Sequence, residues 1–230
     1  MKTNLNFKTI IAALAITLGL SSCMKNDENY TPVEISGISL INASPTADKL
    51  DVYIDNTRAS VNDFVFGTKM DYLNAYTGTR TFRVAKSGAT TAFYSKDFKL
   101  EPSVGYSAFL INKTDNLEIL MLADELKVPA TGKAHVRFVN VSPDATALSL
   151  SITGQTTSLA TAIAYKASST FVEINAAEKV SFDIKTADGV TSSPLQNVKI
   201  EAGKIYTVWA KGLVAATDDT KFGVAIFTHK

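Results

Sequence analysis

The sequence contains little cysteine and little histidine, and it lacks a strong charge of either sign. Cys23 is the only cysteine in 230 residues, so no intrachain disulfide forms and the fold must be held by its core. The two histidines, His135 and His229, have no cysteine or histidine partner at metal-ligand spacing, which argues against a transition-metal site. The formal net charge is +1 and the basic residues are scattered, so we expect no nucleic-acid partner.

Motifs that carry catalytic chemistry are absent too. The chain has no Gly-x-Ser-x-Gly nucleophile elbow and no phosphate-binding glycine loop. Asp218 and Asp219 lack the spacing of a calcium loop. His229 is the penultimate residue, so we expect it on a frayed chain end. We therefore predict no catalytic residues, no metal and no cofactor, although a carboxylate pair for glycoside cleavage depends on spatial distances that a sequence does not give.

The N-terminus has the features of a secretory signal. Lys2 and Lys8 precede an apolar stretch, residues 10–20, that is shorter than the roughly 20 residues needed to span a bilayer. The segment Leu20-Ser21-Ser22-Cys23 resembles the bacterial lipobox, which implies that Cys23 is lipidated and becomes the mature N-terminus. We predict a lipoprotein signal peptide at 1–22. The alternative is an ordinary cleaved signal followed by an incidental cysteine.

The residues after Cys23 are polar and lack an apolar period. We interpret 23–35 as a lipidated, flexible tether. Asp27-Glu28 resembles the short acidic export signal of surface lipoproteins in Bacteroidota-type bacteria. The alternative is that these are two solvated linker charges.

The rest of the chain contains an internal duplication. Ile41-Asn42-Ala43-Ser44-Pro45 returns as Val139-Asn140-Val141-Ser142-Pro143, and Tyr106 returns as Tyr206. The repeat is the length of a domain rather than of a solenoid unit. Proline and glycine interrupt the pattern at 127–132. We predict one domain at 36–128 and a second at 132–230.

Each copy alternates polar and apolar residues over short segments separated by turn signals, as in residues 134–139 and 205–210. No segment has a convincing long helical period. The predicted fold class is all-β, with two tandem antiparallel Ig-like β-sandwich domains after the lipoprotein signal and tether.

Several repeated residues are expected to be structural. Tyr106 and Tyr206 follow a turn and open a strand, which resembles the tyrosine corner of immunoglobulin-like sandwiches. The Asn-x-Ser-Pro element supplies a side chain that bonds nearby backbone and a proline that stops the strand. This predicts turn roles for the repeated residues of both copies, which are Asn42, Pro45, Asn140 and Pro143. A ligand site at this element is the less favoured alternative.

The residues 136–145, Val-Arg-Phe-Val-Asn-Val-Ser-Pro-Asp-Ala, resemble the opening signature of the DUF4397 domain of bacterial surface and secreted proteins. Residues 200–208 resemble its closing signature. Copy one carries weaker forms and lacks the basic residue before its Asn-Ala-Ser-Pro. The resemblance implies tandem copies, a β-sandwich fold and an envelope location. It supplies no catalytic residue.

One pair of aromatic residues is a candidate recognition surface. If Tyr206, Val208 and Ala210 face the core, strand alternation places Trp209 on the opposite face. Phe109 holds the equivalent position in copy one. We interpret the two as either a ligand surface or an interdomain surface, with packing against the sister domain as the favoured explanation.

These observations predict a non-enzymatic protein anchored to the outer membrane by lipid, facing the cell surface and binding a protein or glycan partner. A periplasmic orientation is an alternative. A structural accessory subunit of an outer-membrane or periplasmic complex is the second hypothesis. A glycosidase is the least favoured, because the search for catalytic motifs is empty.

Overall fold

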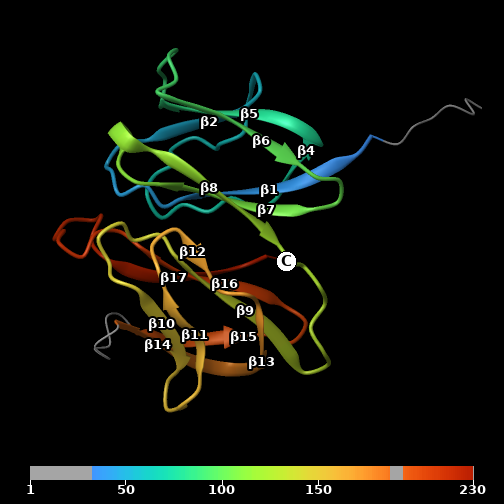
Figure 1. Cartoon of the computed structure of the whole chain (residues 1–230), viewed down its shortest axis with the longest axis vertical. Helices are drawn as coiled ribbons and strands as arrows, with labels where there is room; N and C mark the ends of the chain where they lie inside the picture. The colour runs from blue at the N-terminus through green and yellow to red at the C-terminus, as the bar shows by residue number, and fades with distance from the viewer. Residues whose placement is uncertain (1–32, 187–193, 230) are drawn as a thin grey trace, which may run out of the picture. The chain divides into compact units, whose positions relative to one another are not determined.

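The computed structural model describes residues 33–186 and 194–229 (Figure 1). The residues from Glu34 onward form one compact unit. Among the described residues, regular structure consists of β-strands and one 3-10 turn, Thr114–Asn116. The predicted all-β fold with sandwich-like domains is therefore confirmed.

The first half of the unit contains two four-stranded sheets. Its strands are β1 (Ile35–Asn42), β2 (Leu50–Ile54), β3 (Thr57–Arg58), β4 (Leu73–Tyr76), β5 (Gly78–Lys86), β6 (Tyr94–Leu100), β7 (Gly105–Ile111) and β8 (Glu118–Asp124). The order β3-β2-β5-β6 forms what we call the first outer sheet, and β4-β1-β7-β8 forms the first inner sheet.

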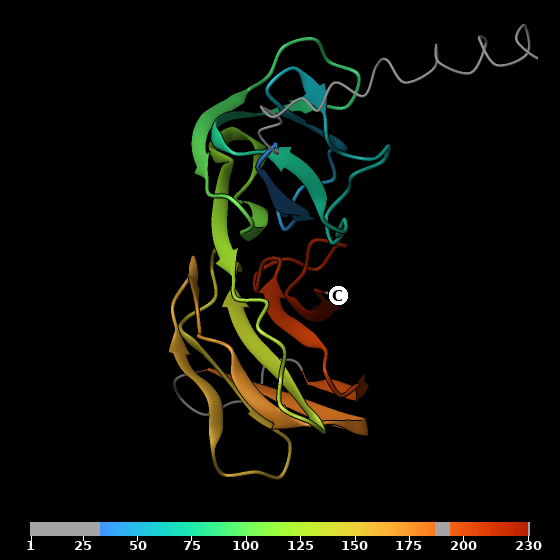
Figure 2. The same ribbon diagram turned by 90° about the vertical axis from the view of Figure 1, so that its right-hand side faces the viewer.

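The second half repeats this plan. Its strands are β9 (Lys133–Asn140), β10 (Leu148–Ile152), β11 (Ser158–Ile163), β12 (Ala167–Ser168), β13 (Val172–Asn175), β14 (Ala177–Thr186), β15 (Leu195–Ile200), β16 (Ile205–Lys211) and β17 (Gly223–Thr228). The second inner sheet has the order β12-β9-β16-β17, with β13 also paired to β9, and the second outer sheet has the order β11-β10-β14-β15. Figure 2 shows the first half in blue to green and the second in yellow to red.

The strand pairing differs from the expected antiparallel pattern at one place in each half. β1 pairs with β7 in parallel, and β9 pairs with β16 in parallel. The reason lies in the connection. After β1 the chain crosses to the outer sheet, forms β2, β5 and β6, and returns, so that β7 enters beside β1 in the same direction. The duplication includes this crossover.

Each half has its own apolar core between its outer and inner sheets. In the first half, Leu40, Phe82 and Leu110 are fully buried in this core. In the second half, Phe138, Phe182 and Val208 hold the corresponding layer. Alternation along the strands sends these side chains to one face of their sheet.

A third apolar layer lies between the two inner sheets. We call it the shared layer, and its buried members are Ile41, Ala43, Phe109, Ile111, Val139, Val141 and Trp209. This layer explains why β1, β7, β9 and β16 are buried on both faces along most of their length. Strands covered on both sides carry near-continuous apolar runs, as residues 38–41 and 108–111 do.

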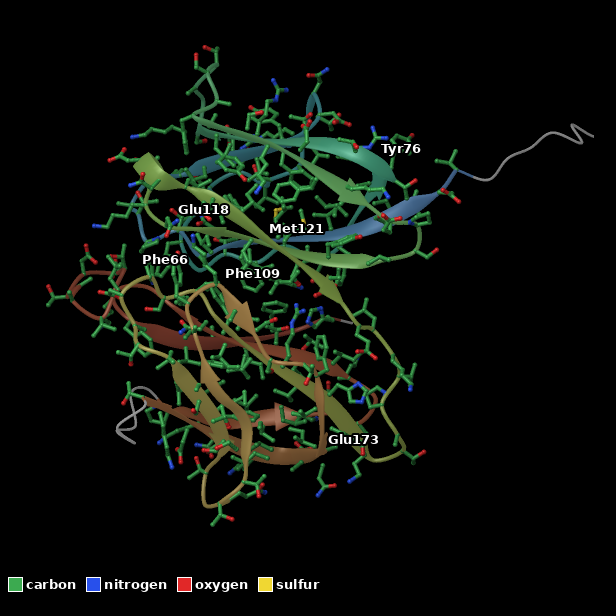
Figure 3. All side chains as sticks on the ribbon, in the orientation of Figure 1. Phe66, Tyr76, Phe109, Glu118, Met121 and Glu173 are labelled. Carbon is green, nitrogen blue, oxygen red and sulfur yellow. The ribbon has the colours of Figure 1, made fainter. Side chains whose placement is uncertain are left out.

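The shared layer is built from equivalent positions of the two copies. Ile41 corresponds to Val139, and Phe109 corresponds to Trp209. The ring centroids of Phe109 and Trp209 lie 5.8 Å apart in an edge-to-face arrangement. Figure 3 labels Phe109 among the side chains on the inner side of its sheet. The halves therefore meet through the same face of the fold, as the subunits of a twofold dimer do.

Truncation of Trp209 tests the importance of this layer. Trp209 is 2% exposed, so Trp209→Ala should lower the free energy of unfolding by about 3–5 kcal/mol, measured by chemical denaturation. Phe93, at 40% exposed, is the control, and Phe93→Ala should change stability by less than about 1 kcal/mol. If the two variants lose the same small amount of unfolding free energy, the shared layer does not contribute to stability as expected.

Candidate functional site

A cluster of polar side chains lies at one end of the shared layer. It consists of Tyr72, Ser107, Asp124, Arg137, Thr207 and His229, which we call the polar cluster. Its members come from both halves of the chain. Ser107 and Thr207 are equivalent positions on β7 and β16, and the strand registers make Asp124 equivalent to His229. The register of β4 and β13 makes Tyr72 equivalent to Phe171.

The centre of the polar cluster is a buried ion pair. Arg137 Nη2 donates to Asp124 Oδ1 at 2.5 Å, and the side chains are 3% and 0% exposed. Arg137 also donates to Ser107 Oγ at 3.0 Å and to the Ala123 carbonyl oxygen at 3.3 Å. The Phe171 ring lies 4.8 Å from the guanidinium carbon. A buried pair is tolerable only when further hydrogen bonds satisfy the remaining donors and acceptors, as they do here.

A chain of hydrogen bonds holds the imidazole of His229 on both of its nitrogens. Arg137 Nε donates to Thr207 Oγ1 at 2.9 Å, and the Thr207 hydroxyl then donates to His229 Nε2 at 2.7 Å. On the other side, Tyr72 donates its only hydroxyl proton to Asp124 Oδ2 at 2.5 Å. The Tyr72 oxygen therefore accepts from His229 Nδ1 at 2.7 Å. With the Thr207 hydroxyl as the donor to Nε2, this pattern corresponds to a neutral imidazole with its proton on Nδ1.

Electrostatics agree with the neutral form. Burial, together with the positive charges of Arg137 and Lys69, lowers the pKa of His229 to about 3. Asp124 lies 3.7 Å from the imidazole, but Arg137 already neutralises its charge. Burial and the Asp124 carboxylate raise the pKa of the Tyr72 hydroxyl above its usual range. Both groups therefore act as fixed hydrogen-bonding groups at neutral pH.

Two glycines place the Tyr72 ring. Gly37 on β1 and Gly105 on β7 are direct partners in the parallel register. A Cβ on Gly37 would lie 3.0 Å from Tyr72 Cδ1, and one on Gly105 would lie 3.3 Å from Tyr72 Cε1. The ring therefore lies across bare backbone, which lets its hydroxyl reach Asp124 and His229. In the second copy these positions are His135 and Ile205, so the arrangement belongs to the first half alone.

A surface pocket of about 790 Å³ opens beside the polar cluster. Tyr72 and His229 form part of its wall. Its other lining residues are Ile35, Ser36, Gly37, Asp71, Asn74, Ser103, Val104, Gly105, Leu126, Glu201, Lys204 and Thr228. Ligand pockets of proteins are typically about 300–1,000 Å³, so this concavity has a suitable size.

The pocket does not expose a nucleophile of the cluster. Thr207 and His229 form a hydroxyl–imidazole pair, the arrangement that activates a nucleophile in hydrolases. Thr207 and Ser107 are both fully buried, however, so neither hydroxyl is open to a substrate in this structure. No group of three or more metal-ligating side chains occurs within residues 33–186 and 194–229.

The structure places the predicted aromatic pair inside the molecule. Trp209 and Phe109 lie in the shared layer between the halves, and at 2% and 0% exposed they offer no surface to a ligand. The expectation for His229 was wrong. This residue is 3% exposed and is held by Thr207, Tyr72 and its backbone bond to Ile205, because the chain end continues the inner sheet after β17.

The predicted turn and corner residues lie at equivalent places in the two halves. The Tyr106 and Tyr206 hydroxyls accept from the backbone nitrogens of Glu101 and Glu201 at 3.1 and 3.0 Å, which ties each strand to the turn before it. Such a bond five residues upstream is the geometry of a tyrosine corner.

The Asn-x-Ser-Pro elements form matching turns. Asn42 Oδ1 accepts from the Ser44 nitrogen at 3.1 Å, and Asn140 Oδ1 accepts from the Ser142 nitrogen at 3.2 Å. Pro45 and Pro143 follow these turns where β1 and β9 have ended. Neither element lines the 790 Å³ pocket.

Sequence reasoning missed the polar cluster. Arg137 had a signal, because a charged residue inside an apolar strand is rarely buried without a partner. Tyr72 and Asp124 carried no such sequence signal, since each lies at the end of a strand, where polar residues are common. The predicted signal peptide at 1–22, Cys23 and residues 23–32 of the predicted tether at 23–35 lie outside the described residues. In the part of the chain that the structure describes, no helix is long and apolar enough to cross a membrane.

The profile of DUF4397, a domain of unknown function, matches residues 36–151. This is just over half of the chain, and the chain belongs to the DUF4397 family. The match covers the whole first half and continues through β9 into β10. The predicted second copy of the domain, and the boundaries 36–128 and 132–230, stay predictions. No curated protein matches the chain.

The solved structures that match this chain are distant from it. Family 41 carbohydrate-binding modules from streptococcal virulence factors, described as recognising α-glucan, share 12% identity at a TM-score of 0.26, covering 82% of this chain and 96% of theirs. A family 26 module of Eubacterium rectale Amy13K, solved with maltoheptaose, shares 7% identity at 0.27, covering 84% and 96%. A Bacteroides ovatus protein described as a cell adhesion protein shares 11% identity at 0.24, covering 87% and 97%. Similarities at this level identify no ligand for this chain.

The buried histidine should make stability depend on pH. The pKa of His229 is about 3 in the folded state against an ordinary value near 6.5, so only the unfolded chain takes up this proton between those values. The contribution is complete above about pH 6.5 and is lost as the pH falls toward about 3. Between about pH 7.5 and about pH 5 this group alone should lower the free energy of unfolding by about 2 kcal/mol.

Denaturation curves at several pH values check this expectation. His229→Gln should flatten the slope over that range, whereas the control His135→Gln should keep the slope of the native sequence. An unchanged slope in His229→Gln would show that the imidazole does not titrate on unfolding.

Proposed function

We propose that this chain is a non-enzymatic protein held in the bacterial outer membrane by lipid on Cys23, and that it binds a protein or glycan partner at the cell surface. The anchor is supported by the lipobox-like Leu20-Ser21-Ser22-Cys23 and the polar tether that follows it. Two or more acyl chains hold a protein stably, since each buried CH₂ contributes about 0.8 kcal/mol. The acidic pair Asp27-Glu28 supports the surface orientation.

The observation that carries the binding role is the open pocket above a fixed polar floor. Every buried side-chain nitrogen and oxygen among the described residues has a hydrogen-bond partner, so the cluster beneath the pocket has no unsatisfied group that would drive it to rearrange. Around it, Asn74 and Lys204 line the pocket without a side-chain partner among the described residues. A rigid floor with free polar groups at the wall is the arrangement of a recognition site.

Loss of the cysteine tests the anchor. Cys23→Ala should move the protein from the membrane fraction to the soluble fraction of the producing bacterium, read by immunoblot after fractionation. Ser22→Ala serves as the control, because a small residue before the cysteine preserves the lipobox. Membrane retention of the Cys23→Ala protein would refute lipid anchoring. Protease digestion of intact cells then separates a surface orientation from a periplasmic one.

Filling the pocket tests the binding role. Asn74→Arg places a long side chain in the pocket wall on an exposed strand position, so the fold should be unaffected. The purified full-length native protein is incubated with envelope and medium, and the retained material is analysed for both peptides and sugars. The Asn74→Arg variant should not retain this material. Glu173→Arg is the matched control, because Glu173 holds the same strand position in the second half. Equal retention by both variants would exclude this pocket as the binding site.

A further inference from the structure

The rim of the pocket presents an apolar platform on the edge of the first inner sheet. Strand β4 alternates, so that Ala75 enters the core while Asn74 and Tyr76 face outward. Tyr76 pairs with Ile35 across the strands, and Asn74 pairs with Gly37. Tyr76 is 63% exposed and Ile35 is 43% exposed, and Figure 3 shows Tyr76 at this edge. The Arg80 guanidinium carbon lies over the Tyr76 ring at 6.0 Å from its centroid, and the remaining surface of Tyr76 lies open with Ile35 beside the pocket.

The charges around this platform are mixed. Asp71 is bound by Lys69, and that hydrogen bond lowers the pKa of the Asp71 carboxyl. Glu201 lies 3.5 Å from Lys199, and Lys204 adds a positive charge to the wall. Carboxylates with their own lysines do not create a field of one sign. The pocket therefore has no strong preference for a charged ligand.

Free hydrogen-bonding groups stand next to the apolar platform. The Asn74 amide, the Ser103 hydroxyl and the Lys204 ammonium have no side-chain partner among the described residues, and all three line the pocket. An amide offers two donors and one acceptor, a hydroxyl offers both, and an ammonium offers three donors. Such a set suits a ligand with many neighbouring hydroxyl groups.

We propose that this site takes a neutral oligosaccharide. The inference rests on the proposed binding function and names the class of ligand. A pyranose ring has one flat face of C–H groups and an edge of hydroxyls. The C–H face fits against the Tyr76 ring and Ile35, while the hydroxyls meet Asn74, Ser103 and Lys204. Stacking on an exposed aromatic ring combines apolar contact with a hydrogen-bonding rim, which gives orientation without charge.

The second half lacks this arrangement at the equivalent positions. Strand register makes Ile35 equivalent to Lys133 and Tyr76 equivalent to Asn175. Lys133 Nζ donates to Asn175 Oδ1 at 2.8 Å, so a polar pair replaces the apolar platform. The two copies share a fold, but only the first presents an aromatic ring here. The chain should therefore carry one sugar site, and Asn175 provides a matched control.

Calorimetric titration of the full-length protein in detergent tests the proposal. The probes are neutral hexasaccharides of three kinds: α-1,4-linked glucose, β-1,4-linked glucose and β-1,4-linked mannose. At least one should bind saturably. Tyr76→Ala should weaken that binding by about tenfold or more, which is about 1.4 kcal/mol, with the melting temperature unchanged. Tyr76→Phe should bind within about twofold of the native sequence, and Asn175→Ala should bind as the native sequence does.

Three outcomes would overturn the sugar assignment. The first is no binding of any probe at millimolar concentration, and the second is sugar binding that Tyr76→Ala leaves intact. The third is a captured protein partner that Tyr76→Ala or Asn74→Arg releases while no sugar binds. This last result would leave the proposed binding function standing and make its partner a protein. Failure of the Asn74→Arg experiment, in contrast, would remove the binding function at this pocket altogether.

Discussion

The ion pair between Arg137 and Asp124 is the constraint around which the two halves are arranged. Both side chains are removed from water between two sheets, where an unpaired charge would be strongly destabilising. Arg137 belongs to the second half and Asp124 to the first, so any separation of the halves leaves both charges without their partner. Further hydrogen bonds cross between the halves beside the pair, from Arg137 to Ser107 and to the Ala123 carbonyl oxygen, and between Tyr72 and His229. The apolar shared layer supplies the attraction between the sheets, and the ion pair fixes the geometry in which they meet.

The interface is built from equivalent positions of the two halves. Equivalent positions face each other across it: Phe109 faces Trp209, and Asp124 lies 3.7 Å from its counterpart His229. A face that pairs with its own copy is what a twofold dimer requires. The copies differ at the polar end of the interface. Ser39 in the first half holds the position of Arg137 in the second, and Asp124 holds the position of His229. Two first halves would place carboxylate against carboxylate with no arginine, and two second halves would leave the arginine unpaired. The polar ends of the two faces are therefore complementary to each other rather than to themselves.

Much of this could be predicted from the sequence, and the remainder could not for identifiable reasons. Strand alternation and the turn signals predicted the all-β sandwich fold, because they are local signals, whereas the second copy of the domain stays a prediction. Strand alternation correctly placed Trp209 on the face opposite Tyr206. The parallel pairing of β1 with β7 was missed, since it depends on the crossover and not on either strand. His229 was misplaced because nearness to a chain end was taken to mean fraying, whereas the last residues continue an inner sheet. The Tyr72 ring lies across two glycines that are distant in sequence, and this lets its hydroxyl reach the polar cluster. No local sequence pattern indicates such a contact.

The same interface accounts for where a recognition site can form. The 790 Å³ pocket lies where the polar end of the shared layer meets the surface, and residues of both halves line it. Its floor is held by hydrogen bonds whose donors and acceptors are all assigned, so a ligand meets groups that are already ordered and loses little affinity to their rearrangement. Its rim is free to vary, because Asn74 and Tyr76 lie on an exposed edge strand whose outward residues carry no load in the core. The residues that hold the halves together are thus distinct from the outward-facing residues of β4.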